Sequence, residues 1–444
     1  MALFSLLLGL VPLLLLSVGL YFGVRLRFFP FLHPLRTLKT LLGAEGGSRT
    51  ASLRATATAL AGTIGVGNMA GVSVALLVGG AGAIFWMWVS ALAAMLLKYA
   101  EITLALDSRP EGGKGGTPHS FRAAGHPKLA RLFALLCLLN TLLLGGAVQT
   151  GAVCDCFSDS FGMPSTLTGA LLLLAALPAL LGGAKRIFSF TARLVPLMCL
   201  LYLGGACLVI LHNIEALPSA IGRIFSGAFS SFSVGGGILG FLSARALREG
   251  AARGLMSNEG GCGTSPLAHA TATPREPAEQ GLFGILEVGI DTLLICTVTA
   301  LAVLTAFDPL PTGLSGLAML RAAFSDALGP LGGLLVTVSL ALFAYGTVLC
   351  EAFYGEACAD FLSEKRPVCR EYRFFFCAAL LLGAWLPGGA LWFITDLLLA
   401  AMTCLNLYLL LRRADRIVAL TRRAKLILPK NRTPCVAKAK KQVP

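Results

Sequence analysis

The sequence carries little charge. Only 13% of its 444 residues are Asp, Glu, Lys or Arg, and 56% are hydrophobic, whereas about 25% of the residues of an ordinary soluble domain are charged. The composition therefore argues against a soluble globular protein and indicates a chain that lies in a membrane.

The sequence also lacks the short motifs of common enzymes, since it has no HExxH, GxSxG or paired-Asp motif. The segment SNEGGCGTSPLAHA, residues 257–270, holds Ser, Glu and His, but Glu259 and His269 have no hydrolase partner pattern. We interpret it as a cytoplasmic closing element in which Ser257 and Asn258 cap a short helix. We expect no enzyme activity and no catalytic residue.

The thirteen cysteines do not form a metal-binding pattern. Most are scattered through apolar runs, where Cys acts as a small packing residue. The one tight pair, Cys154 and Cys156, has no neighbouring His, which is a weak metal signal. We expect packing there, no bound metal and no cofactor.

Eleven apolar runs are each long enough, or nearly so, to cross about 30 Å of hydrocarbon. Lipid accepts only helices and closed barrels, and these runs are too long for barrel strands. The sequence predicts an all-α polytopic membrane protein. The runs are residues 3–24, 55–79, 83–106, 129–153, 165–182, 190–212, 223–247, 280–305, 331–360, 371–387 and 391–411.

The basic residues predict how these helices are oriented. If the first helix starts outside, the alternating inside segments hold 33 of the 36 Lys and Arg residues, as the positive-inside rule requires. We expect the N-terminus outside and the C-terminus inside. The net charge of +14 therefore reflects topology, and the basic tail, residues 413–444, is predicted to anchor at anionic lipid and to bind no nucleic acid.

Glycines interrupt two of the runs. GTIGVGNMAG, residues 62–71, and FSVGGGILGF, residues 232–241, lie about 170 residues and five runs apart. Non-helical backbone at membrane depth survives where it lines a cavity or is buried, and broken helices are a feature of secondary transporters. The alternative is close helix packing through Gly67 and Gly71, which have small-xxx-small spacing.

The two interruptions predict an inverted repeat, because five helices per half reverse the second half relative to the first. We divide the chain accordingly. Residues 1–50 form an extra transmembrane helix with an interfacial segment, 51–222 the first repeat, 223–412 the second repeat and 413–444 the basic tail.

Several long motifs resemble the alanine or glycine:cation symporter family, of the amino acid–polyamine–organocation superfamily. They are ALAGTIGVGNMAGVSVALLVGGAGAIFWMWVSALAAMLLKYAE, GAARGLMSNEGGCGTSPLAHATA, QGLFGILEVGIDTLLICTVTAL and DLLLAAMTCLNLYLLL. The resemblance implies a LeuT-like five-plus-five fold with one added helix. It also implies sodium- or proton-coupled symport of small neutral amino acids such as alanine or glycine by alternating access.

The same resemblance implies a monomer in the inner membrane of a bacterial cell. Its partners would be a small amino acid and the lipid bilayer, with Na⁺ or H⁺ as coupling ion. Two alternatives stay open: a proton-coupled or divergent carrier of another small amino acid or amine, and a channel, although no repeated filter-like loop favours the channel.

Residues carried over by position make up a candidate site. The predicted substrate-binding residues are Gly67, Asn68, Gln149, Gly235, Gly236, Thr347 and Glu351. The predicted ion-binding residues are Thr63, Gly65, Gly346 and Thr347. Gln149 could instead make an interhelical hydrogen bond.

Three positions depart from the family pattern. Val66 replaces a hydroxyl residue, Gly346 replaces the first of two adjacent hydroxyl residues, and Glu351 stands where the family has tryptophan. The two lost hydroxyls weaken the case for sodium. Glu351 is open to three interpretations: a proton carrier, an ionised group that favours a cationic substrate or amine, or a residue facing a hydrated vestibule.

A few other ionisable residues lie within the predicted spans. Placing such a group inside the membrane costs free energy, and such residues are often functional. We expect Lys98 and Glu101 to form an i,i+3 ion pair. Asp291 is expected to order neighbouring helices with Glu287 on the same face, and Asp396 and Asn406 are expected to be structural. Glu356 also lies within a span.

Overall fold

The computed structural model describes residues 2–42, 47–111, 114–229, 245–311, 313–363, 368–386 and 388–427. Every regular element in these ranges is a helix. The helices of the first half are α1 (Ala2–Arg25), α2 (Phe29–Leu32), α3 (Pro34–Leu42), α4 (Gly47–Thr63), η1 (Gly67–Gly71), α5 (Val72–Gly79), α6 (Gly82–Asp107), α7 (Thr117–Ala123), α8 (Pro127–Asn140), η2 (Thr141–Val148), α9 (Gln149–Phe161) and α10 (Ser165–His212).

The remaining helices follow in the same all-helical pattern. They are η3 (Ile214–Ala216), α11 (Leu217–Phe229), α13 (Arg245–Asn258), α14 (Pro266–His269), α15 (Pro277–Val288), η5 (Gly289–Cys296), α16 (Thr297–Ala306), α17 (Gly316–Leu328), α18 (Pro330–Leu362), α19 (Cys369–Leu382), α20 (Gly388–Arg412) and α21 (Ala414–Arg423).

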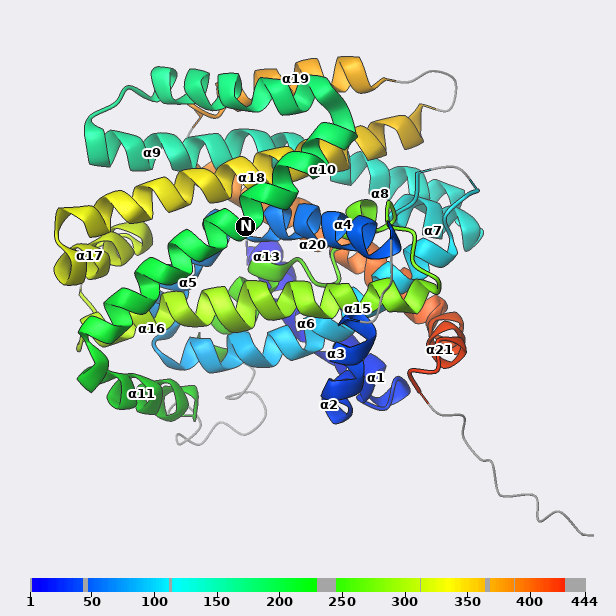
Figure 1. The fold of residues 1–444 in the computed structure, drawn as a ribbon, viewed down its shortest axis with the longest axis horizontal. Helices are drawn as coiled ribbons and strands as arrows, with labels where there is room; N and C mark the ends of the chain where they lie inside the picture. The colour runs from blue at the N-terminus through cyan, green and yellow to red at the C-terminus, as the bar shows by residue number, and fades with distance from the viewer. Residues whose placement is uncertain are drawn as a thin grey trace, which may run out of the picture.

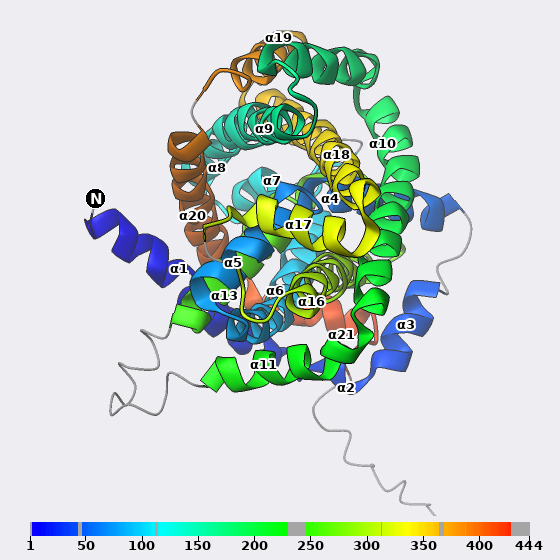
Figure 2. The ribbon, with the colours of Figure 1, turned by 90° about the vertical axis from the view of Figure 1, so that its left-hand side faces the viewer.

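The helices form a bundle with most of their axes aligned (Figure 1). Seen along these axes, α9, α10, α18 and α20 surround α4, α5 and α17 (Figure 2). Within the described residues, six helical stretches are long and apolar enough to cross a membrane, and a seventh is the bent pair formed by 49–63 and 67–79. The all-helical, membrane-spanning fold is therefore confirmed.

Several predicted spans differ from the helices in detail. Runs 165–182 and 190–212 are joined in α10, but Gly183 has φ +67° and divides the two. Most of the predicted span 223–247, with the predicted glycine-rich break at 232–241, lies outside the described residues, which include only its two ends, in α11 and α13. The α19 helix, at 14 residues, is shorter than predicted. The count of eleven, the N-out orientation and the repeat boundaries stay predictions.

The predicted break in the first glycine-rich run is confirmed. The chain bends by 54° between α4 and the segment that begins at Gly67. That segment starts as a π-helix, Gly67–Gly71, before α5 continues it. Glycine weakens a helix by about 1 kcal/mol relative to alanine. The glycine cluster therefore explains why the α-helix is interrupted here.

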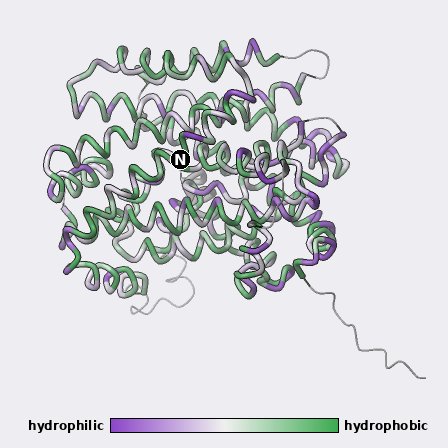
Figure 3. Tube along the Cα trace, in the orientation of Figure 1, coloured by the Kyte–Doolittle hydropathy of each residue, from purple (hydrophilic) through white to green (hydrophobic). Residues whose placement is uncertain are grey.

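Three helices from segments predicted to be cytoplasmic lie toward one end of the bundle. α3, α7 and α21 lie at the right of Figure 1, where hydrophilic stretches also gather in Figure 3. α21 is tied to this end because Arg416 of α21 makes two hydrogen bonds, of 2.9 and 2.6 Å, to Asp107 at the end of α6. α11 and α17 lie at the opposite end (Figure 1).

Candidate functional site

A cavity of about 610 Å³ lies inside the bundle. Its walls come from the break between α4 and η1, from η2 and α9, and from α13, α17, α18 and α20. This volume lies within the range of small-molecule sites. The broken helix therefore borders a cavity, as the transporter interpretation of the glycines predicts.

Gly65, Gln149 and Thr347 meet at this cavity from three different helical segments. A Cβ atom built on Gly65 would lie 2.8 Å from Thr347 Oγ1 and 3.9 Å from Gln149 Oε1. Only glycine leaves room for the threonine hydroxyl here. Gln149 is 4% exposed, and its Oε1 has no hydrogen-bond partner among the described residues. The amide oxygen is thus available to a ligand.

Asn68 holds the break together and does not line the cavity. Its side chain is fully buried. Asn68 Oδ1 accepts a hydrogen bond from the Gly65 N–H at 2.9 Å, and Nδ2 donates to Asp291 Oδ1 at 2.7 Å and Ser257 Oγ at 3.0 Å. The expectation that Asp291 orders neighbouring helices is confirmed, because its contacts join η1, α13 and η5.

The four predicted ion-binding residues lie where α18 passes α4 and the break. Thr63, Gly65 and Thr347 line the cavity, whereas Gly346 does not. Thr347 Oγ1 donates to the Ala61 carbonyl at 3.2 Å. A Cβ on Gly346 would lie 3.5 Å from that same carbonyl oxygen, so α18 packs closely on the last turns of α4.

The structure places only one of three other predicted substrate residues. Gly235 and Gly236 lie outside the residues that the structure describes. Glu351 is fully buried and is absent from the cavity lining. The interpretation of Glu351 as a residue facing a hydrated vestibule does not fit this burial.

Sequence reasoning missed several charged residues of the cavity. Arg253, Glu259 and Asp396 also line the cavity, and Glu259 is only 4% exposed. Asp396 had been expected to be structural, yet it borders the cavity and its Oδ1 has no partner among the described residues. The presence of acids in or near predicted spans was the available signal.

The cavity opens at the end of α9 and α17. Asp155, Asp159 and Arg321 line it there. Asp159 and Arg321 approach to 3.8 Å, and the side chain of Asp159 is 69% exposed. The cavity therefore reaches solvent at the end of the bundle that the charge pattern predicts to be outside.

A buried polar network fills the bundle on the other side of the break. Lys98 of α6 pairs with Glu287 of α15 at 2.9 Å, and both side chains are fully buried. His269 Nε2 lies 3.0 Å from the second oxygen of Glu287, and Gln280 contacts the other ring nitrogen of His269 at 2.9 Å. The network links α6, α14 and α15.

The predicted Lys98–Glu101 ion pair is wrong. Lys98 pairs with Glu287 instead, while Glu101 accepts hydrogen bonds from Asn406 Nδ2 at 2.8 Å and from the Gly263 N–H at 3.2 Å. Groups from other parts of the chain lie closer to Lys98 and to Glu101 than these two residues lie to each other. The structural role expected for Asn406 is confirmed by this contact.

The predicted caps in residues 257–270 are also wrong. α13 ends at Asn258, and Asn258 Oδ1 accepts from the Gly260 N–H at 2.9 Å within the turn that follows. Ser257 donates to Asp291 at 2.7 Å and caps no helix. All fourteen residues of the segment are buried, so it is a core element.

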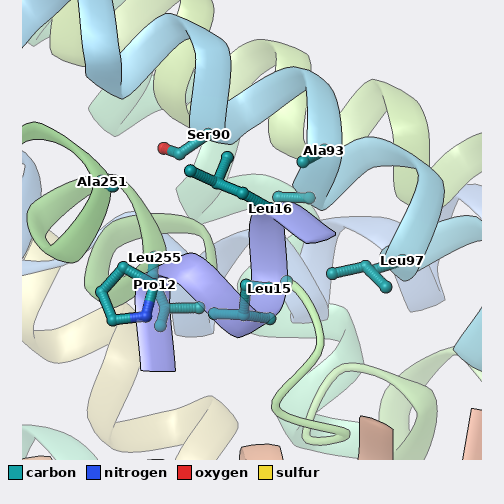
Figure 4. A pocket seen from close by; sticks show the side chains of 10 residues that line it. Pro12, Leu15, Leu16, Ser90, Ala93, Leu97, Ala251 and Leu255 are labelled. Carbon is teal, nitrogen blue, oxygen red and sulfur yellow. The ribbon is translucent and has the colours of Figure 1, made fainter. Parts of the chain in front are cut away.

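Another pocket, between α1, α6 and α13, offers no ligand site (Figure 4). Its volume is about 10 Å³, which is at most the space of one water. Pro12, Leu15 and Leu97 line it with other apolar side chains. Among the described residues, no group of three His, Cys, Asp or Glu side chains is placed to hold a metal.

Comparison with known proteins identifies a family for this chain. Residues 3–426 match the model of the sodium:alanine symporter family. An uncharacterized transporter of Haemophilus influenzae is 38% identical, with 90% of each chain covered. The sodium/alanine symporter AgcS of Methanococcus maripaludis is 37% identical, with 92% of each covered.

A solved structure shares the fold. The crystal structure of MhsT in complex with L-phenylalanine superposes with a TM-score of 0.57 at 13% identity and covers 86% of this chain and 95% of that one. At this identity the likeness concerns the fold alone. On the family match and the identity to AgcS, the chain belongs to the sodium:alanine symporter family.

Proposed function

We propose that this chain is a sodium-coupled symporter that takes up small neutral amino acids, with alanine and glycine as the first candidates. The observation that carries the proposal is the meeting of the helix break at Gly65 with Gln149 and Thr347 at a solvent-connected cavity. Family membership supports amino acid symport coupled to a cation. The choice of amino acid and of ion is our inference.

The broken helix suits a zwitterionic substrate. A helical segment begins at Gly67, which lines the cavity, and the positive end of the helix dipole there favours a carboxylate. Gln149 Oε1, buried and unpartnered, suits an ammonium group. Close packing around Gly65 and Thr347 favours a small side chain.

Sodium would bind beside the substrate, between α4 and α18. Thr347 Oγ1 and the Ala61 carbonyl already face each other there, and Thr63 lies two residues further along α4. Carbonyl oxygens at a helix break are suitable ligands for Na⁺. The hydroxyls missing at Val66 and Gly346 would be replaced by such backbone oxygens.

Alternating access follows from the asymmetry of the bundle. The cavity opens at the end of α9 and α17, while the Lys98–Glu287 network and residues 257–270 close the other side. With the predicted topology this is an outward-facing conformation. Transport would require the closed side to open. We expect the protein to work as a monomer in a bacterial inner membrane.

A second candidate is a proton-coupled carrier of another small amino acid or of an amine. The acidic residues Glu259 and Asp396 at the cavity favour it, because they would attract a positively charged group. The two candidates differ in what drives uptake and in which compound competes.

The test is uptake of radiolabelled alanine by proteoliposomes, with sodium and pH gradients imposed separately. We expect accumulation under a sodium gradient and competition by unlabelled glycine. Accumulation that needs only a pH gradient, or competition by an amine alone, would favour the second candidate. Passive equilibration without accumulation would indicate a channel.

A further inference from the structure

Glu351 is a buried acid without a partner. The residue is fully buried in α18, and neither carboxylate oxygen has a hydrogen-bond partner among the described residues. Buried carboxylates normally accept several hydrogen bonds or pair with a cation. Glu356, five residues later in the same helix, shows the usual arrangement, since Arg373 donates to both of its oxygens at 2.5 and 3.1 Å.

Glu351 lies one helical turn from Thr347, which lines the cavity. Thr347 and Glu351 are four residues apart in α18, so they share a helix face. In the neighbouring segment formed by η2 and α9, Gly145 and Gln149 are also four residues apart. Gly145 packs directly against the Glu351 side chain and leaves no room for a Cβ atom. The pair Glu351–Gly145 thus stacks beneath the pair Thr347–Gln149, on the closed side.

Among the described residues, the titratable groups that interact electrostatically with Glu351 offer it no positive charge. Those on other elements are Cys137 of α8, Glu259 after α13 and Tyr372 of α19, and Cys350 is its neighbour on α18. None of them is a cation, and Glu259 is itself an acid that lines the cavity. An ionised carboxylate would stand unpaired in a low-dielectric interior, which is strongly unfavourable.

We propose that Glu351 is neutral in this conformation and is a proton-binding site that couples proton movement to transport. The inference rests on the proposed function, because it assigns a second coupling ion to the same transport cycle. When Glu351 binds the proton, a carboxylate oxygen forms an O–H bond with a proton from hydronium, whose own O–H bond breaks to leave a water molecule. When the closed side opens and hydrates the carboxyl, that O–H bond breaks and the proton passes to water there.

The decisive variant is Glu351→Gln, which keeps the shape of the protonated acid but cannot release a proton. Glu356→Gln is the matched control, because it alters the same residue type on the same helix at a partnered position. Two readouts separate the proposal from a structural role. One is the infrared carbonyl stretch of protonated carboxyls in the purified protein at neutral pH. The other is proton entry into proteoliposomes on addition of alanine, followed with a trapped pH-sensitive dye.

We expect wild type and Glu356→Gln to show a protonated-carboxyl band that Glu351→Gln lacks. Alanine should drive proton entry in the wild type, and this signal should fall to the level of empty liposomes in Glu351→Gln, while alanine counterflow stays measurable. Equal bands in wild type and Glu351→Gln, or equal proton entry, would overturn the inference. If the wild type shows no alanine counterflow, the proposed function fails instead, and the infrared comparison still decides whether Glu351 holds a proton.

Discussion

At the scale of single residues, variants of Gln149 and Asn68 distinguish a role in alanine binding from a role in stability. Gln149 Oε1 has no partner among the described residues, whereas Asn68 bonds to Gly65, Ser257 and Asp291. Gln149→Ala should weaken alanine binding, since a lost hydrogen bond to a charged ligand is worth about 1.5–3 kcal/mol, but it should leave the unfolding temperature near that of the wild type. Asn68→Ala should weaken alanine binding and also lower the unfolding temperature.

Thermal unfolding in detergent and the alanine concentration for half-maximal uptake measure the two effects. Normal alanine affinity in Gln149→Ala would mean that this residue is an interhelical contact. An unchanged unfolding temperature in Asn68→Ala would contradict its role in holding the break.

Two glycines of the same stretch give a second residue-scale prediction. A Cβ on Gly65 would meet Thr347 Oγ1 at 2.8 Å, but a Cβ on Gly71 has nothing within 4 Å. Gly65→Ala should therefore abolish most uptake by displacing the threonine hydroxyl from the site, while Gly71→Ala should transport normally. Initial uptake rates, normalised to protein in the membrane, compare the two, and equal rates would show that the Gly65 contact is unimportant.

The sequence anticipated part of this site and missed another part. Gln149 and Thr347 were assigned through motifs, and they meet at the cavity with Gly65. Asn68 was assigned to substrate but is occupied by Ser257 and Asp291, residues that lie far away in the chain. Hydrogen bonds between distant segments depend on packing geometry, which neither spacing nor composition encodes.

At the scale of elements, the buried pair Lys98–Glu287 joins α6 to α15. Removal of one partner from a fully buried pair leaves an uncompensated charge and costs about 3–5 kcal/mol. Lys98→Met should therefore lower the unfolding temperature strongly. The double variant Lys98→Met, Glu287→Gln should recover much of the loss, because both replacing side chains are uncharged.

The matched control is Lys114→Met. Lys114 pairs with Asp360, but its side chain is 49% exposed, and surface pairs contribute about 1 kcal/mol or less. Unfolding temperatures that fall equally in Lys98→Met and Lys114→Met would contradict a special role for the buried pair.

Element positions followed from the sequence where local chemistry determined them. The glycine cluster predicted a break, and the chain bends by 54° there. Lys98 and Glu101 looked like partners because they are three residues apart on one helix, yet Glu287 lies 189 residues from Lys98 and takes that place. Periodicity locates a helix, but it does not say which helix packs against it.

At the scale of the whole molecule, the protein is a bundle with one open and one closed side. The cavity reaches solvent near Asp159 and Arg321, and buried polar contacts close the opposite side. Apolar length and the distribution of positive charge predicted the membrane-spanning bundle. They could not predict which side would be open, because both conformations of a transporter share one sequence.

The most direct test of the central claim is a cryo-electron microscopy map of the protein with alanine and sodium. We predict density for the amino acid between the Gly65–Gly67 break, Gln149 and Thr347, and density for an ion beside the Ala61 carbonyl, both absent when the two ligands are left out. Amino acid density at Asp396 or Arg253, with none at the break, would contradict the account.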